Sequence, residues 1–204
     1  MKVKISTDST CDLPREFVER YDIGVLPLYI IRDGVSLKDG IEITAQDMYE
    51  YTERTGKLCS TSAVTVADYT SAWTEWLRDA DAIVHVAFSS ELSASCNNAR
   101  IAAEEFDNVT VVDSLNLSTG FGQLVIDAAI MAEAGHTPAE IAAEVERLVP
   151  KMDVSFVLNT LEYLRKGGRC TTIQALGANL LGLKPCIEVD NGKMGVAKKY
   201  RGKI

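Results

Sequence analysis

The sequence is short of histidine and of paired cysteines. It has two histidines, His85 and His136, and none of its five cysteines forms a CxxC pair. A His/Cys metal site is therefore not expected, and the scattered cysteines are typical of reduced thiols. The sequence also contains no G-x-S-x-G elbow and no G-x-x-x-x-G-K loop. Neither an α/β-hydrolase nor a P-loop nucleotide enzyme is indicated.

Long apolar runs and a basic excess are missing as well. No apolar run approaches the roughly 20 residues that span a bilayer, and the N-terminus lacks the apolar core of a signal peptide. The net charge of −8 argues against nucleic-acid binding. A content of 47% hydrophobic and 25% charged residues in 204 is that of an ordinary globular protein. We expect a cytoplasmic protein.

What the sequence does contain is an alternation of short apolar strands and amphipathic helices, which predicts an α/β fold with a parallel or mixed sheet covered by helices. We expect strands over 3–5, 25–31, 82–88, 109–112 and 154–157. We expect helices over 14–21, 45–55, 66–77, 92–105 and 138–149, with a further long helix ending near 134. Thr44, Thr65 and Thr137 are expected as N-caps.

The pattern of expected secondary structure changes after Pro150. A short helix over 161–166, another over 172–183 and a hairpin with an Asn-Gly turn at 191–192 are expected there. We therefore divide the chain into an N-terminal α/β domain, 1–150, and the start of a second α/β domain, 151–204. About fifty residues are few for an independent core, so the second domain is expected to be incomplete.

Four polar junctions stand out, at 7–10, 60–62, 89–95 and 113–119. Three of them directly follow expected strands, and ligands of open α/β sheets bind beyond the carboxyl ends of the strands. We expect these junctions to converge on one edge of the sheet. The alternative is that their Ser, Thr and Asp side chains only cap helices and form turns.

The junction at 89–95 carries four serines. A serine nucleophile needs a neighbouring base, but His85 lies inside an expected strand and His136 in a turn. We instead expect an anion site, with Ser90 near the helix N-cap and with Ser93 and Glu91 in the first turn, where free amides favour negative charge. Neutral donors suit a carboxylate. Ser89 and Ser90 are expected to end the strand and cap the helix, and Ser95 to be an ordinary helix residue.

Several of these segments together carry a family resemblance. They are Thr7-Asp-Ser-Thr-Cys-Asp-Leu-Pro14, Val25-Leu-Pro-Leu28, Ser60-Thr-Ser62, Ser89-Ser-Glu-Leu-Ser93, Val112-Asp-Ser114, Ser118-Thr-Gly-Phe-Gly122, Leu161-Glu-Tyr-Leu-Arg-Lys-Gly-Gly-Arg169 and Leu180-Leu-Gly-Leu-Lys-Pro185. In this order and spacing, the chain resembles the DegV family of bacterial fatty-acid-binding proteins over nearly its whole length.

The resemblance implies a long-chain fatty acid whose tail lies in a tunnel between two α/β domains. It implies that Thr61 and Ser93 hold the carboxylate, helped by the backbone near Ala94, and Ser62, Asp8 and Ser9 complete the expected ligand-binding set. Arg169 and Arg201 resemble positions that face a partner fatty acid kinase, which phosphorylates the bound carboxylate. No cofactor, metal or catalytic residue is implied.

The chain departs from the family pattern in three places. Ala63-Val64 follows Thr61-Ser62 where the family has x-Pro, and Ala94 replaces a glycine after Ser93. The chain also ends soon after Arg201, where family members continue with more of the second domain and a His-x-Gly segment. We expect a fatty acid carrier that is not itself an enzyme. The alternatives are a small-molecule phosphotransferase or hydrolase using Asp8 and Ser93, and a truncated domain that binds nothing.

Overall fold

A four-stranded parallel sheet forms the centre of the protein. The computed structural model describes residues 1–158, 161–170 and 183–201. The strands lie in the order β2-β1-β6-β7, with bounds β1 (Val3–Asp8), β2 (Gly24–Leu26), β6 (Ala82–Ala87) and β7 (Val109–Asp113). Every residue of β6 is buried, as expected for the apolar run at 82–88. The expected α/β fold is confirmed.

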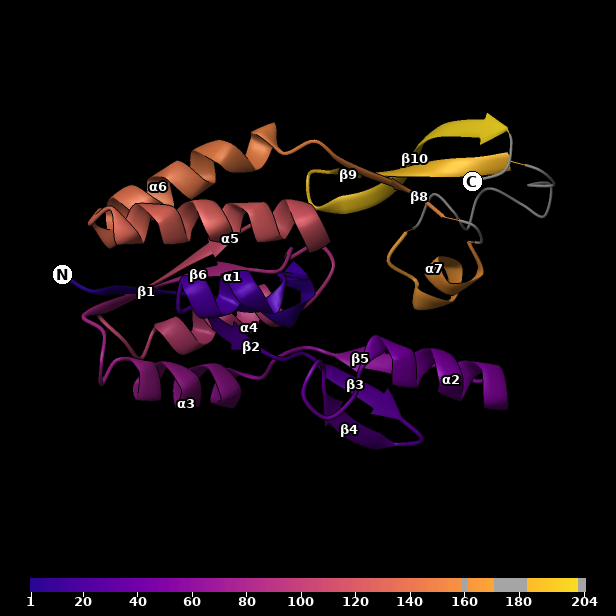
Figure 1. Cartoon of the computed structure of the whole chain (residues 1–204), viewed down its shortest axis with the longest axis horizontal. Helices are drawn as coiled ribbons and strands as arrows, with labels where there is room; N and C mark the ends of the chain where they lie inside the picture. Colours follow the sequence, from indigo (N-terminus) through magenta and orange to yellow (C-terminus); the bar gives the residue numbers. More distant parts are fainter. Residues whose placement is uncertain (159–160, 171–182, 202–204) are drawn as a thin grey trace.

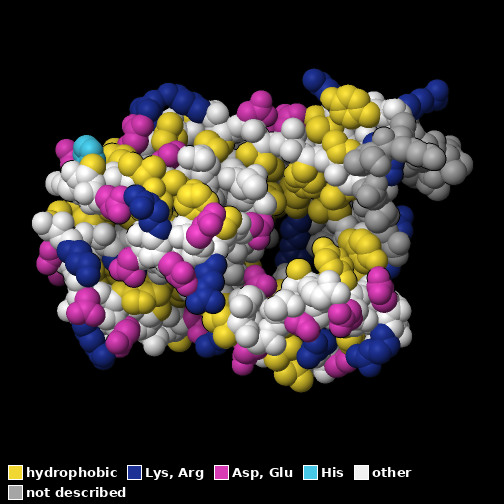
Figure 2. Space-filling view, in the orientation of Figure 1, with side chains coloured by type: hydrophobic (Ala, Val, Ile, Leu, Met, Phe, Trp, Pro, Cys, Tyr) yellow, Lys and Arg dark blue, Asp and Glu magenta, His cyan; other side chains and the backbone are white. Residues whose placement is uncertain are grey.

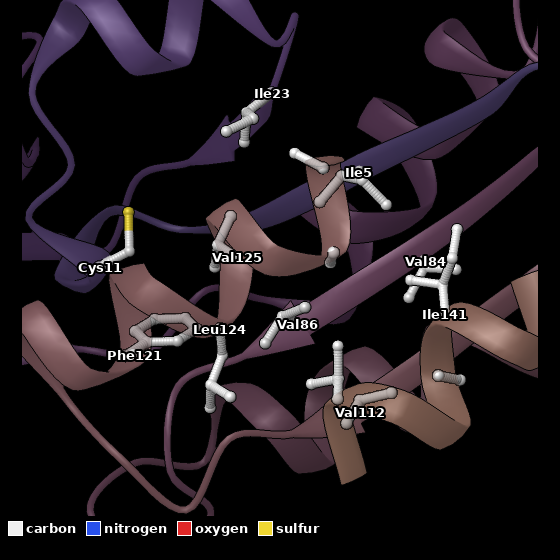
Figure 3. Packing of buried hydrophobic residues seen from close by; sticks show 14 residues of the cluster. Ile5, Cys11, Ile23, Val84, Val86, Val112, Phe121, Leu124, Val125 and Ile141 are labelled. Carbon is white, nitrogen blue, oxygen red and sulfur yellow. The ribbon is translucent and has the colours of Figure 1, made fainter. Parts of the chain in front are cut away.

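Helices cover both faces of this sheet (Figure 1). One face carries α5 (Ser118–Glu133) and α6 (Pro138–Leu148), with the short α1 (Arg15–Arg20) beside them. Figure 3 shows the side chains of these helices meeting those of the strands, with Leu124 near Val86 and Val112. The other face carries α3 (Val66–Trp76) and α4 (Ser95–Ala103), where Trp73 and Tyr69 pack against Ile83.

Three of the helices begin where the sequence predicts. Thr44, Thr65 and Thr137 each form a capping box, at the start of α2 (Ala45–Thr55), α3 and α6. In each box the threonine hydroxyl accepts from the third helical N–H, and the acidic side chain at that position accepts from the threonine N–H. These three N-cap predictions are confirmed.

The expected strand over 25–31 is wrong, because the structure has two strands there in different sheets. β2 ends at Leu26, and β3 (Tyr29–Arg32) belongs to a small antiparallel sheet of order β4-β3-β5. Pro27 separates them and has no N–H to donate to a ladder. The next N–H, that of Leu28, donates to the Ser9 hydroxyl at 3.2 Å instead of to a strand.

The small sheet carries one of the polar junctions. Its other strands are β4 (Val35–Lys38) and β5 (Ser60–Ser62). Thr61 lies opposite Ile30 in the register of β5 with β3. The three residues of β5 are all exposed, so the hydroxyls of this junction are accessible at the surface. The junction is therefore a strand, and the helix α3 begins four residues beyond it.

A third sheet, of order β10-β9-β8, lies at the other end of the chain. Its strands are β8 (Val154–Val157), β9 (Leu183–Asp190) and β10 (Lys193–Arg201), and α7 (Glu162–Gly167) lies beside them (Figure 1). The expected hairpin is confirmed, since Asn191 and Gly192 turn between β9 and β10 with φ of 47° and 80°. The helix expected over 172–183 falls almost entirely outside the described residues.

This third sheet has a small core of its own. Ile187 and Cys170 are buried in it, with Phe156, Leu164 and Met194 packed around them. The predicted boundary near residue 150 falls at the 3-10 turn η2 (Val149–Lys151), between α6 and β8. That the two parts are separate domains stays a prediction.

Candidate functional site

The polar junctions that follow β1, β6 and β7 meet at one edge of the parallel sheet. β6 pairs in parallel with both β1 and β7, so the three carboxyl ends lie together. Hydrogen bonds tie the junctions to one another. The Ser114 N–H donates to Ala87 O at 3.1 Å, and the Ser90 N–H donates to Asp113 Oδ1 at 3.2 Å. The expected convergence on one sheet edge is confirmed for these three junctions, whereas the fourth, at 60–62, forms β5 of the small antiparallel sheet.

The junction at 89–95 is a turn, and the helix that follows it begins later than expected. α4 begins at Ser95 rather than near residue 92, and its N-cap position is Ala94, which makes no side-chain cap. Ser90 is therefore not the cap, and Ser93 and Glu91 lie before the helix instead of in its first turn. The reason is a local turn, in which Ser89 O accepts the N–H groups of Leu92 and Ser93 at 3.1 Å each.

Ser93 and Ser95 are joined directly. Their hydroxyl oxygens lie 3.0 Å apart, and the Ser95 N–H donates to Ser93 Oγ at 3.1 Å. Ser95 is fully buried and Ser93 half-buried. The expectation that Ser95 is an ordinary helix residue is wrong, because its hydroxyl also accepts the buried Val64 N–H at 3.3 Å.

That last bond connects the Ser93 segment to the segment that carries Thr61. Val64 lies just after β5, and Asn98 of α4 donates to Val64 O at 2.7 Å. Sequence reasoning missed Asn98, because nothing in the sequence distinguishes it from its neighbour Asn97. The structure thus places the segments of Thr61, Ser62, Ser93 and Ala94 against the same first turn of α4. Thr61, Ser62 and Ala94 are exposed.

Asp8 lies inside the protein. Its Oδ1 accepts from the Tyr69 hydroxyl at 2.5 Å, and its Oδ2 accepts from the Phe88 N–H at 2.8 Å. Burial raises the pKa of Asp8 from 3.8 to about 6, although these two hydrogen bonds act in the opposite direction. Asp8 therefore holds the end of β6, which leads into the serine junction, rather than facing outward.

Ser9 is likewise engaged with the protein. Its hydroxyl donates to Asp39 Oδ2 at 2.7 Å and accepts from the Leu28 N–H. This pair of bonds ties the end of β1 to the loop that leads into the small antiparallel sheet. Ser9 thereby helps to fix β3, and with it β5 and Thr61, relative to the parallel sheet.

His85 is a packed core residue of β6. It is fully buried, its Nδ1 lies 3.0 Å from the Ser6 hydroxyl, and its ring meets those of Tyr69 and Trp73 edge-on. Burial lowers the pKa of His85 to about 3, so the imidazole is neutral at physiological pH. His85 Nε2 lies 3.6 Å from Asp8 Oδ1, too far for a hydrogen bond.

The turn of the β9–β10 hairpin docks onto the same serine junction. The Ser89 hydroxyl donates to Gly192 O at 2.9 Å, and Lys193 Nζ lies 3.1 Å from Glu91 Oε2. A Cβ on Gly192 would stand 2.7 Å from Ser89 Oγ, so this close approach requires glycine. The expectation that Ser89 ends the strand and caps the helix is wrong, because β6 ends at Ala87 and the Ser89 hydroxyl binds the hairpin instead of α4.

The two arginines expected to face a partner lie on the third sheet and its helix. Arg169 and Arg201 are both exposed. Arg169 follows Gly168, the left-handed C-cap of α7 with φ 72°, and its guanidinium donates to Gly167 O at 2.8 Å. Arg201 is the last residue of β10.

The space-filling view shows a hollow between the parallel-sheet part, the β9–β10 and α7 part, and the part with β3–β5 and α2 (Figure 2). Hydrophobic side chains gather at its margin beneath β9–β10 and over α7 (Figure 2). A separate cavity of about 400 Å³ lies between α4, α6, the loop after β7 and the end of β9, and Thr61 and Ser93 do not line it. Its lining includes Arg100, Asp113, Glu146 and Asp190.

The described part of the chain offers neither a metal-binding cluster nor a membrane-spanning helix. Within 1–158, 161–170 and 183–201, no group of three or more His, Cys, Asp or Glu side chains is arranged to hold a metal ion. None of the helices in these ranges is both long enough and apolar enough to cross a membrane.

Comparison with known proteins gives consistent matches over the chain. Residues 2–204 match the family model described as "Uncharacterised protein, DegV family". A DegV domain-containing protein of Deinococcus radiodurans is 34% identical over 203 residues, which cover 99% of this chain and 72% of that protein.

Solved structures match at the level of the fold as well. A DegV family protein from Thermus thermophilus, described by its fatty acid binding, superposes with a TM-score of 0.92 at 34% identity, covering 99% of this chain and 72% of that one. A stearic-acid-binding protein from Eubacterium ventriosum superposes with a TM-score of 0.88 at 27% identity, covering 98% of this chain and 71% of that one.

Proposed function

This chain belongs to the DegV family, and we propose that it is a carrier that binds a long-chain fatty acid. The observation that carries this proposal is the join between the Thr61 and Ser93 segments on the first turn of α4. It brings the two segments that carry the Thr61 and Ser93 hydroxyls against the same helical turn. Two similar proteins support the same ligand class: the Thermus thermophilus protein is described by fatty acid binding, and the Eubacterium ventriosum protein binds stearic acid.

We assign the carboxylate to Thr61 and Ser93, with Ser62 and the backbone at Ala94 beside them. A carboxylate only accepts hydrogen bonds, and each neutral bond contributes about 0.5–1.5 kcal/mol net. A buried methylene contributes roughly 0.8 kcal/mol, so a tail of ten buried methylenes outweighs the head group. The head group then sets orientation, and the length of the apolar site sets chain preference. The hollow with its hydrophobic margin (Figure 2) is the candidate path for the tail.

We assign Asp8 and Ser9 a supporting role in this site. The hydrogen bonds of both residues lead to other parts of the protein. Their contribution is to hold the end of β6 and the small sheet, from which Ser93 and Thr61 extend.

A kinase partner is the second part of the proposal. Arg169 and Arg201 are exposed and carry charges that suit a phosphorylated or acidic partner surface. In this scheme the carrier presents the carboxylate and the partner supplies the phosphoryl chemistry. A pull-down of a candidate kinase by the wild type but not by Arg169→Ala or Arg201→Ala supports it, and equal capture by all three contradicts it.

The alternative of a phosphotransferase or hydrolase is less well supported. A serine nucleophile needs a base, and Asp8 is bonded to Tyr69 and Phe88. His85 is fully buried in β6 and its Nδ1 contacts Ser6, not Ser93. Robust turnover of a phosphate or carboxylate ester by the protein alone would restore this alternative.

The direct test is to extract lipid from purified protein, identify it by mass spectrometry, and titrate palmitate. We expect a bound fatty acid or saturable palmitate uptake, and absence of both contradicts the carrier function. The double variant Thr61→Ala, Ser93→Ala should weaken palmitate binding more than hexadecan-1-ol binding. Ser71→Ala, which alters an exposed serine of α3, is the control and should change neither.

A further inference from the structure

Two side chains in the first turn of α4 form hydrogen bonds with the backbone N–H and the backbone carbonyl of Val64. The Val64 N–H donates to Ser95 Oγ at 3.3 Å, and Val64 O accepts from Asn98 Nδ2 at 2.7 Å. Ser95 and Asn98 are three residues apart, and therefore share one face of the helix. Val64 is fully buried, so these two side chains satisfy polar groups that water cannot reach.

The same serine also contacts Ser93. Ser95 is joined to Ser93 through both its hydroxyl, at 3.0 Å, and its N–H, at 3.1 Å. Its hydroxyl is therefore the meeting point of the segment after Thr61 and the turn that ends at Ser93.

We propose that Ser95 and Asn98 are positioning residues of the carboxylate site. They fix the position of the Thr61 segment relative to the Ser93 hydroxyl. The proposal rests on the proposed function, because it names what sets the geometry of that same site. Neither residue is assigned a contact with the ligand.

The hydrogen bonds of Ser93 indicate why the position of its hydroxyl affects which head group is preferred. Ser93 Oγ already accepts the Ser95 N–H, so its hydroxyl hydrogen is left for Ser95 Oγ or for an outside acceptor. A carboxylate accepts only, whereas an alcohol both donates and accepts. If the Thr61 segment and the Ser93 hydroxyl are no longer held in position, the preference for an acid over an alcohol of equal length should fall. The free energy that the buried tail contributes to binding should stay the same.

The test compares palmitate and hexadecan-1-ol binding by the full chain and its variants. In Ser95→Ala and in Asn98→Ala we expect palmitate to bind roughly three- to tenfold more weakly, the equivalent of one neutral hydrogen bond. Hexadecan-1-ol binding should change less than about twofold, so the acid-to-alcohol ratio falls. Ser95→Thr, which keeps a hydroxyl, should restore the ratio.

Matched controls come from the same region. Asn97→Ala changes an exposed asparagine next to Asn98, and Ser90→Ala changes an exposed serine of the same junction. Both should leave the ratio unchanged. If Ser95→Ala does not fold, Asn98→Ala, at a half-buried position, tests the same relation with Ser95 in place.

The outcomes separate the two proposals. An equal loss of acid and alcohol binding in the variants, or no change, overturns the positioning role and leaves the carrier function standing. A wild type that binds neither probe overturns the carrier function and the positioning role with it. A selective fall of the ratio that Ser95→Thr reverses supports both.

Discussion

The buried carboxylate of Asp8 makes the stability of this protein depend on pH in a specific direction. Burial raises its pKa to about 6 from 3.8. Between about pH 4 and about pH 6, the folded protein keeps a proton on Asp8 that the unfolded chain has lost. The contribution to stability is therefore fully present below about pH 4 and is lost as the pH rises to about 6. Two pH units at about 1.4 kcal/mol each amount to about 3 kcal/mol.

The variant Asp8→Asn isolates this contribution. An asparagine can still accept the Phe88 N–H and can donate to the Tyr69 oxygen, so the site keeps two hydrogen bonds without an ionisable group. We expect the unfolding free energy of the wild type to fall relative to that of the variant by up to about 3 kcal/mol between pH 4 and pH 7. Burial lowers the pKa of His85 to about 3, so in both proteins its contribution to stability decreases as the pH falls below the ordinary pKa of about 6.5.

The assay is urea unfolding followed by tryptophan fluorescence, since Trp73 is buried against the ring of Tyr69. A second variant, Tyr69→Phe, removes the donor that lowers the pKa of Asp8, so the pH window should extend upward. A difference between wild type and Asp8→Asn that is flat with pH refutes the reasoning. A difference that grows in favour of the wild type at high pH would mean that Asp8 is stabilised as an ion.

Two further substitutions test the local geometry. Gly192→Ala places a Cβ 2.7 Å from Ser89 Oγ at φ 80° and should lower the unfolding free energy by about 2–3 kcal/mol; Gly34→Ala, at φ 85° with open space around it, should cost only about 1 kcal/mol, and equal costs would refute the close contact. Thr65→Ala removes the capping box of α3 and should cost about 1 kcal/mol in thermal unfolding, whereas an unchanged midpoint would contradict the cap.

Features governed by neighbouring residues could be predicted from the sequence. The three capping boxes depend on a threonine and an acidic residue three positions later, and the Asn-Gly turn depends on two adjacent residues. The alternation of strands and helices likewise gave the parallel sheet and the edge on which the polar junctions meet. The capping boxes and the turn are complete within a few residues, and the alternation is a sum of such local patterns, so no distant contact was needed to recognise them.

Features governed by distant contacts could not be predicted. The strand expected over 25–31 divides at Pro27, and the N–H of Leu28 is used by Ser9, a residue nineteen positions earlier. The start of α4 was misplaced because serines at 89, 90, 93 and 95 are all acceptable caps. Their true partners are Val64, 31 residues before Ser95, and Gly192, 103 residues after Ser89.

The four serines of that junction differ in burial, and the difference separates their roles. Ser89 and Ser95 are fully buried, and their hydroxyls bind Gly192 O and the Val64 N–H. Ser90 is exposed and only its backbone is engaged in the described contacts. Ser93 is half-buried, and its oxygen is held by the Ser95 N–H while its hydroxyl hydrogen has a choice of acceptors. A ligand donor must be both fixed in position and reachable, and of the four hydroxyls Ser93 is the one that meets both conditions.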